Sequence, residues 1–182
     1  QTVYSSWSPY KKDTGTKTQS ILKCVEYSYS NLSEPAQKLL LCLAPFTGVI
    51  NINWLEHYTK QLKSQTVLAD FPFDQWQTVL QEAMNWGLMK PHEDEILANI
   101  GYMTLHPIFP YSLRTRLSEP ALSQYNAGIE SAFCEHYNGI AYRLLETIRL
   151  KEVEKRQIGD MVIGAEYENL MTALQLTLKT AI

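Results

Sequence analysis

The chain has 182 residues, of which 45% are hydrophobic and 19% charged, the balance of a globular protein rather than a disordered or fibrous one. Its net charge of -3 and pI near 5.8 give no bulk attraction to nucleic acid or to an anionic membrane. No apolar run approaches the ~18 residues of a membrane-spanning helix, and the first residues lack the basic-then-apolar layout of a secretory signal. Because the chain starts at Gln1, we expect a fragment of a longer protein.

Residues 1–19 show no sustained periodicity, and we interpret them as a connecting arm. Four helices are expected next, over 18–29, from Ser33 to Pro45, over 53–63 and over 74–86, where Gly87 stops the last one. Ser33 and Asn53 are the expected N-caps, because their side chains can accept a first-turn amide. The expected inward residues recur at helical spacing: Ile21, Leu22, Val25, Tyr29, Leu39, Leu40, Leu43, Trp54, Leu55, Tyr58, Leu62, Trp76, Val79, Leu80, Ala83 and Trp86.

Strand-like segments alternate with these helices. Residues 47–52 predict a turn and a short strand, and residues 88–106 predict a β-hairpin around the polar turn 91–95. This order of elements is typical of a winged helix-turn-helix domain, with the hairpin as its wing. Pro107 ends the hairpin, and a short helix is expected over 111–117.

Beyond Pro120 the pattern becomes purely helical. We expect a long helix over 121–149, a solvated mixed-charge connector over 151–156 and a final helix over 160–180. Two antiparallel helices at this point suggest a TPR-like hairpin, the start of an α-solenoid. The expected inward residues are Ile129, Phe133, Tyr137, Ile140, Ala141, Leu144, Ile148, Tyr167, Leu170, Met171, Leu174 and Leu178. The chain is thus predicted to be mainly α, with an arm (1–19), a winged helix (20–117) and a helical hairpin (118–182).

Motifs of catalysis and metal binding are missing from the sequence. There is no GxSxG, no HExxH and no GxxxxGK[ST] phosphate-binding loop, so we expect no enzymatic activity from this chain. The turn 92–95 is rich in acidic residues, but adjacent side chains rarely converge on one ion, and we interpret it as a solvated hairpin tip. His57 and His136 are not accompanied by a nucleophile in a hydrolase order. Glu34, Glu56 and Glu82 are interpreted as helix-surface charges.

The three cysteines, Cys24, Cys42 and Cys134, form no CxxC pair and have no zinc-binding spacing with histidine. We therefore expect buried reduced thiols and a cytoplasmic location.

The fourth helix is the place where a DNA-binding winged helix would carry its recognition residues. Between Phe73 and Gly87 there is no Lys or Arg, and Asp74 and Glu82 are acidic. Since DNA affinity depends on neutralising phosphates, this composition argues against DNA binding by that helix.

Four sequence blocks carry a resemblance to a known family. They are Tyr-Ser-Tyr-x-x-Leu-Ser at 27–33, Leu-Ala-Pro-Phe at 43–46, Leu-His-Pro at 105–107 and Glu-x-Glu-Asn-Leu-x-x-Ala-Leu at 166–174. In this order, over roughly 20–180, the chain resembles the winged helix and following helical segment of STAND-class signalling NTPases, the NB-ARC relatives. Pro107 stands where the plant and animal subgroup has Asp, which points to a bacterial-type protein.

The resemblance implies a non-catalytic regulatory module that couples the nucleotide state of an adjacent NTPase domain to C-terminal sensor repeats. In that family the histidine at position 106 contacts the β-phosphate of bound ADP. No cofactor is expected in this chain, while ADP and ATP are implied for the full-length protein. The implied partners are the nucleotide-binding domain and the repeats in cis, together with an unidentified protein ligand.

Three aromatic residues of the arm, Tyr4, Trp7 and Tyr10, have no local core to join. They would contact either the nucleotide-binding domain or another copy of the protein. Two other functions stay open. One is a winged-helix transcription regulator that binds DNA through its wing or another face, and the other is a plain protein-interaction scaffold.

Overall fold

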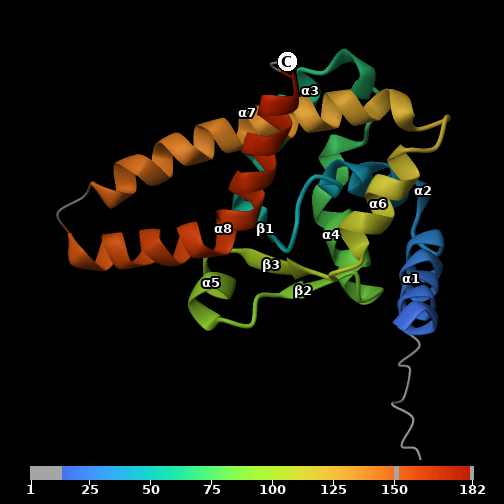
Figure 1. Ribbon diagram of the computed structural model, residues 1–182, viewed down its shortest axis with the longest axis horizontal. Helices are drawn as coiled ribbons and strands as arrows, with labels where there is room; N and C mark the ends of the chain where they lie inside the picture. Colours follow the sequence, from blue (N-terminus) through green and yellow to red (C-terminus); the bar gives the residue numbers. More distant parts are fainter. Residues whose placement is uncertain (1–13, 150–151, 181–182) are drawn as a thin grey trace, which may run out of the picture.

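Helices dominate the structure, and one small sheet lies among them (Figure 1). The computed structural model describes residues 14–149 and 152–180. The mainly α class predicted from the sequence is confirmed. The elements are α1 (Thr14–Ser30), α2 (Glu34–Leu40), β1 (Val49–Asn51), α3 (Leu55–Lys63), α4 (Trp76–Asn85), β2 (Met89–Pro91), α5 (Glu95–Asn99), β3 (Tyr102–Leu105), α6 (Phe109–Leu117), α7 (Ser123–Ile148) and α8 (Val153–Thr180). Short 3-10 helices cover Leu41–Leu43, Ile52–Trp54, Thr66–Leu68 and Phe73–Gln75.

The sheet is antiparallel, with β3 in the centre between β1 and β2. Ile50 of β1 pairs with Met103, and Lys90 of β2 pairs with Thr104. The predicted strand near 47–52 and the predicted hairpin are therefore both present, and they form one sheet. The turn of the hairpin differs from the prediction, because it contains α5. Asp94 caps this helix by accepting hydrogen bonds from the amides of Ile96 and Leu97.

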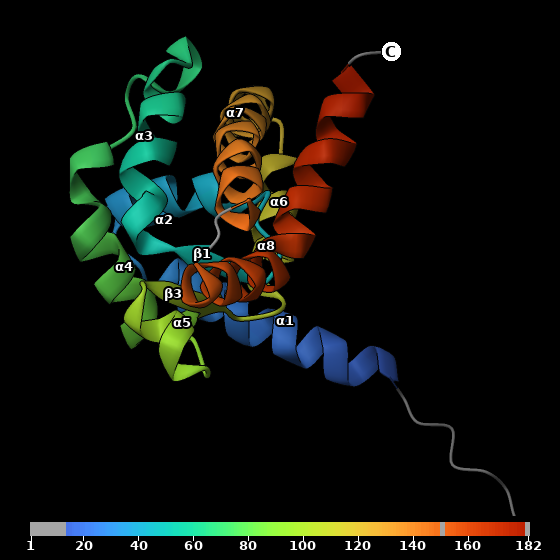
Figure 2. The same cartoon turned by 90° about the vertical axis from the view of Figure 1, so that its left-hand side faces the viewer.

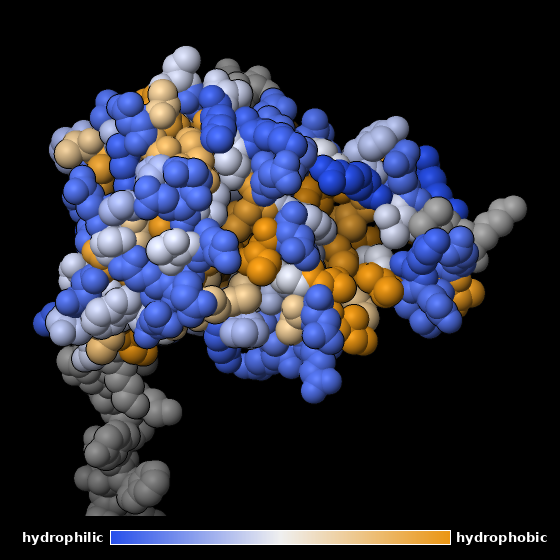
Figure 3. Space-filling view, turned by 180° about the vertical axis from the view of Figure 1, so that it is seen from behind, coloured by the Kyte–Doolittle hydropathy of each residue, from blue (hydrophilic) through white to orange (hydrophobic). Residues whose placement is uncertain are grey.

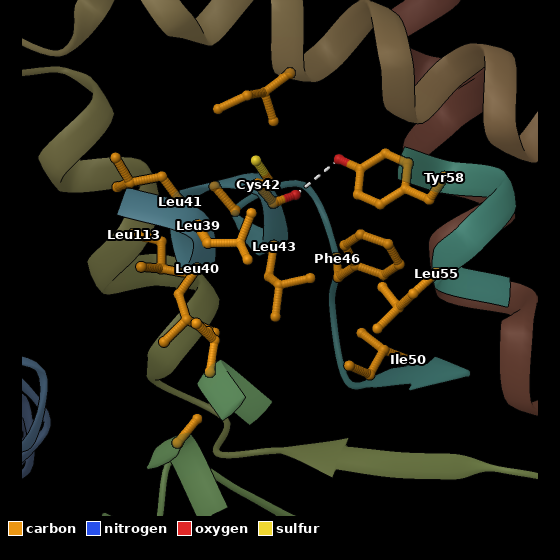
Figure 4. Close-up of a cluster of buried hydrophobic side chains, with 14 of the residues drawn as sticks. Leu39, Leu40, Leu41, Cys42, Leu43, Phe46, Ile50, Leu55, Tyr58 and Leu113 are labelled. Atoms are coloured by element: carbon orange, nitrogen blue, oxygen red, sulfur yellow. Dashed lines mark hydrogen bonds between the residues drawn. The ribbon is translucent and has the colours of Figure 1, made fainter. Parts of the chain in front are cut away.

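A leucine-rich core lies between α2 and the sheet (Figure 4). Leu39, Leu40 and Leu43 are completely buried, as their helical spacing predicts. Full burial of each such side chain contributes about 2 kcal/mol. At the edge of this core the Tyr58 hydroxyl donates a 2.7 Å hydrogen bond to the carbonyl of Cys42, so the phenol is buried without losing its polar partner.

The long helix α7 packs against elements on both sides of it. The two halves of the fold are the part from α1 to α6, which contains the sheet, and the α7–α8 hairpin, and α7 is the element that joins them. Figure 2 shows α3 and α8 on opposite sides of it. Its residues Phe133 and Tyr137 contact Phe46 of the leucine-rich core, with ring centroids 5.0 and 6.0 Å apart. At Gly139 the two helices lie at ordinary contact distance, since a Cβ there would lie 3.4 Å from Cε1 of His57 on α3. The α7–α8 hairpin is therefore packed on the rest of the fold through the part of α7 that carries Phe133 and Tyr137.

Several predictions about helix ends were wrong. The helix α1 begins at Thr14, inside the predicted arm, while the arm's aromatic residues Tyr4, Trp7 and Tyr10 lie outside the described residues. Ser33 stands at the N-cap of α2, but its side chain caps no amide; its hydroxyl and amide donate to the carboxylate of Glu82 instead.

The predicted N-cap at Asn53 and the predicted connector over 151–156 were also wrong. Asn51, not Asn53, provides the cap near α3, because its side-chain oxygen accepts from the amide of Asn53. The connector is helical from Val153 onwards, so most of it is the first turn of α8. The flanking pair Glu152–Lys155, 2.6 Å apart, stabilises this helix start.

Some burial predictions were also wrong. Cys24 is exposed, and only Cys42 is fully buried among the three free thiols. Trp86 is 37% exposed, since it follows the last turn of α4 and stacks edge-on against exposed Tyr27. On α7, Ala141 and Ile148 face outward.

The inward face of α8 differs most from the prediction. Tyr167, Leu174 and Leu178 are each more than half exposed. The buried residues are Val162, Glu166, Asn169 and Ala173, which follow the same helical spacing one face further round. This face is buried because it packs against α7 and β1. Among the described helices, none combines the length and apolar character needed to cross a membrane.

Candidate functional site

A buried polar cluster joins α8 to the sheet and to α7. We call it the clasp; it consists of Tyr102, Tyr137, Glu166 and Asn169, together with Thr47. Each contributing element brings its residue for a structural reason: β3 buries Tyr102, α7 buries Tyr137, and the inner face of α8 carries Glu166 and Asn169 one helical turn apart. The clasp therefore contains side chains from both halves of the fold.

Asn169 makes the direct link to the start of β1. Its Oδ1 accepts hydrogen bonds from the amide and the hydroxyl of Thr47, both at 2.9 Å. Its Nδ2 donates to the carbonyl of Val49 at 3.0 Å and to Oε2 of Glu166 at 2.9 Å. The side-chain amide thus uses both acceptor sites and both donor hydrogens, which fixes its orientation. A residue of α8 in this way acts as a hydrogen-bonding partner for the edge of the sheet.

Glu166 is completely buried, and its two carboxyl oxygens differ in their hydrogen bonding. Oε2 accepts a 2.7 Å hydrogen bond from the Tyr137 hydroxyl in addition to that from Asn169. Oε1 has no hydrogen-bond partner among the described residues, and neither has the buried hydroxyl of Tyr102. Burial raises the pKa of the Glu166 carboxyl, and the hydrogen bonds from Asn169 and Tyr137 offset only part of that rise.

The two tyrosines are affected by the same carboxyl. Burial raises the pKa of Tyr102 and of Tyr137, and the charge of Glu166 raises both further. Both phenols therefore stay protonated and can act only as neutral hydrogen-bonding groups. The clasp holds one carboxyl in a protein interior, and none of the ion pairs among the described residues includes it, so its protonated form is favoured more than in water.

A histidine pair lies on the other side of α7. Nδ1 of His57 on α3 and Nδ1 of His136 on α7 are 2.9 Å apart, so one ring donates and the other accepts. Burial, then the neighbouring His57 and Arg143, lower the pKa of His136 to about 3. Burial, Arg143 and Lys60 lower the pKa of His57. The pair is thus neutral in the folded protein, and it links the two halves of the fold a second time.

His106, the residue predicted to sense nucleotide, directly follows β3. Its amide donates to the carbonyl of Leu88 at 2.9 Å, which continues the pairing of the hairpin by one residue. Its Nδ1 accepts a hydrogen bond from the amide of Ile108 at 3.3 Å. In a neutral ring the proton is therefore on Nε2, which has no partner among the described residues. The ring is partly buried and lies outside the leucine-rich core. Its contact with a nucleotide stays a prediction.

The remaining candidate side chains have structural partners. In the turn 92–95, His92 accepts from the amide of Asp94, and Glu93 pairs with Lys90. Glu56 forms an ion pair with Lys60. The carboxylate of Glu82 accepts hydrogen bonds from Ser33 and is therefore not a free surface charge. Within the described ranges, no three metal-ligating side chains come together.

Comparison of the chain with protein-family models, with curated proteins and with solved structures found no match.

Proposed function

We propose that this chain is a non-catalytic regulatory module of a STAND/NB-ARC-like signalling ATPase, which couples the nucleotide state of an adjacent domain to helical sensor repeats. In this proposal the sheet is the input side, because His106 would contact the nucleotide. The hairpin α7–α8 is the output side, because it would lead into the repeats. The first subdomain would be a winged helix, and the second the beginning of a TPR-like array.

The observation that best supports this proposal is the clasp. A module that transmits a change needs its input and output parts to move together, since small shifts are amplified only where packed parts have discrete arrangements. Asn169 ties α8 to the start of β1, and β1 pairs with β3, which ends beside His106. A continuous path of hydrogen bonds thus runs from α8 to the strand before the proposed sensor.

The local geometry of His106 supports the proposed contact with a nucleotide phosphate. The hydrogen bond from Ile108 engages Nδ1 and leaves Nε2 as the free donor, and Pro107 restricts the backbone next to it. A donor held in one direction suits a phosphate oxygen. By contrast, α4 has no basic residue along its length, which disfavours the DNA-binding alternative for the reason given above.

The experiment is ADP release from a longer protein in which a domain with a phosphate-binding loop precedes this chain. His106→Ala should speed ADP release by about tenfold, the loss expected for one hydrogen bond to a charged group. His92→Ala is the matched control, because His92 belongs to the same hairpin and its side chain accepts a hydrogen bond only from the nearby amide of Asp94. Equal release rates for wild type and His106→Ala would favour the plain scaffold instead.

A further inference from the structure

An apolar groove lies between the two arms of the α7–α8 hairpin. It is lined by Ile140, Leu144 and Thr147 of α7, by Ile158, Gly159 and Val162 of α8, and by Trp54; among the described lining residues Arg143 alone is charged. Its volume is about 230 Å³. Figure 3 shows hydrophobic side chains gathered between the main body and the tip of the hairpin.

The groove has a fixed floor and an exposed edge. Gly159 lets the two arms come close, since a Cβ there would lie 2.9 Å from Cγ2 of Thr147. Val162 is buried and belongs to the small core under the sheet, so the floor does not move independently of the fold. Ile158 at the edge is 44% exposed, and Ile148, next to Thr147, is 41% exposed. Apolar side chains in this arrangement form a site for another apolar surface.

The charge at the groove limits what can bind there. Arg143 is exposed, and the three ion pairs found among the described residues all lie elsewhere. Its positive charge acts on the neighbouring His57 and His136, which are themselves neutral. The groove therefore combines apolar walls with one exposed cation that has no ion-pair partner among the described residues, and an acidic group on a ligand would pair with it.

We propose that this groove binds an amphipathic helix of a partner protein, with an acidic side chain next to its apolar stripe. Apolar side chains from one turn of that helix would enter the groove between α7 and α8, as in other helix-in-groove complexes. The acidic side chain would pair with Arg143. This proposal does not depend on the nucleotide role of His106.

The experiment uses two synthetic 18-residue helical peptides with the same leucine stripe, one flanked by Glu and one by Lys, titrated against this chain by fluorescence anisotropy. The Glu peptide should bind roughly tenfold more tightly than the Lys peptide, because attraction to Arg143 replaces repulsion. Ile158→Asp should abolish binding of both, while Leu174→Asp, a change at a similarly exposed residue outside the groove, should not.

Two further variants separate the local charge from the charge of the whole molecule. Arg143→Glu should reverse the preference for the Glu peptide, and Arg149→Glu should leave it unchanged. The proposal is wrong if neither peptide binds, if both bind equally, or if the two arginine variants behave alike. It is also wrong if sedimentation shows that the chain dimerises through this face and that Ile158→Asp makes it monomeric. Circular dichroism of each variant confirms folding, and Ile158 is exposed enough for the Asp to be tolerated.

Discussion

Asn169 accepts two hydrogen bonds from Thr47, a residue 122 positions earlier in the chain, through one side-chain oxygen. The contact connects the inner face of α8 to the residue just before the sheet. Because the amide nitrogen of Asn169 also bonds Val49 and Glu166, a single side chain satisfies polar groups of both halves of the fold. Such fully satisfied networks are the ones that fix a unique arrangement of packed elements.

Replacement of Asn169 by alanine should lower the free energy of unfolding by about 2–4 kcal/mol, because the amide of Thr47 and the carbonyl of Val49 lose their partner in a partly buried place. Urea denaturation followed by circular dichroism measures this loss. Asn138→Ala is the matched control, since Asn138 is an exposed residue on α7. Asn138→Ala should be neutral or slightly stabilising, because alanine is the better helix former, and a loss of equal size in both variants would show that the clasp is not responsible.

Acid should weaken the fold through the histidine pair. The pKa of His136 is about 3 in the folded protein and ordinary, about 6.5, in the unfolded chain. Protons therefore bind the unfolded state more strongly between these values, and stability falls as the pH decreases from 6.5 towards 3. For His136 alone the loss between pH 6.5 and 5 is about 2 kcal/mol.

Urea denaturation of wild type and of His136→Gln at several pH values measures this dependence. The variant should show a smaller loss between pH 6.5 and 5, because glutamine does not titrate. An unchanged slope would mean that His136 is accessible to protons in the folded state.

Glu166 should lower the stability of the fold as the pH rises, whereas His136 lowers it as the pH falls. Burial raises the pKa of its carboxyl in the folded protein, so the folded state holds this proton more strongly than the unfolded chain. The stabilisation from the protonated carboxyl is complete below the ordinary pKa and is lost as the pH rises through the raised value.

Glu166→Gln imitates the protonated carboxyl and keeps an oxygen that can accept from Tyr137 and Asn169. It should therefore be more stable than wild type at pH 8 and about equal to it at pH 4, as measured by thermal unfolding. Glu168→Gln, an exposed position on the same helix, serves as the control. A variant less stable than wild type at pH 8 would show that the ionised carboxylate is what the clasp requires.

Apolar periodicity predicted the elements whose burial is apolar. Leu39, Leu40 and Leu43 on α2 and Val79 and Ala83 on α4 are buried as expected, and the strands of the hairpin follow from the short apolar runs on either side of a polar turn. Apolar periodicity could not predict that β1 would pair with β3. The pairing of Val49 with Thr104 joins distant segments and depends on how the helices between them pack.

The inward face of α8 could not be predicted from apolar periodicity, for a physical reason. A leucine stripe predicts an inward face only where a neighbouring element covers it, and Leu174 and Leu178 have no such cover among the described residues. The face that is covered carries Glu166 and Asn169, whose polar groups are compensated by Tyr137, Thr47 and the backbone of β1. The signal was present as Val162, Glu166, Asn169 and Ala173 at helical spacing, but their partners come from distant segments. The histidine pair, 79 residues apart, was hidden in the same way.

We infer that the clasp makes the sheet and the α7–α8 hairpin one cooperative unit. Native-state hydrogen exchange of wild type and Asn169→Ala tests this claim directly. The probes are the amides of Ile52 and Leu105, which bond to Gly101 and Gly48 across β1 and β3, together with the amides of the middle of α8. We predict that the substitution lowers the protection of both sets by the same factor. Reduced protection in α8 alone, with Ile52 and Leu105 unchanged, would contradict the account.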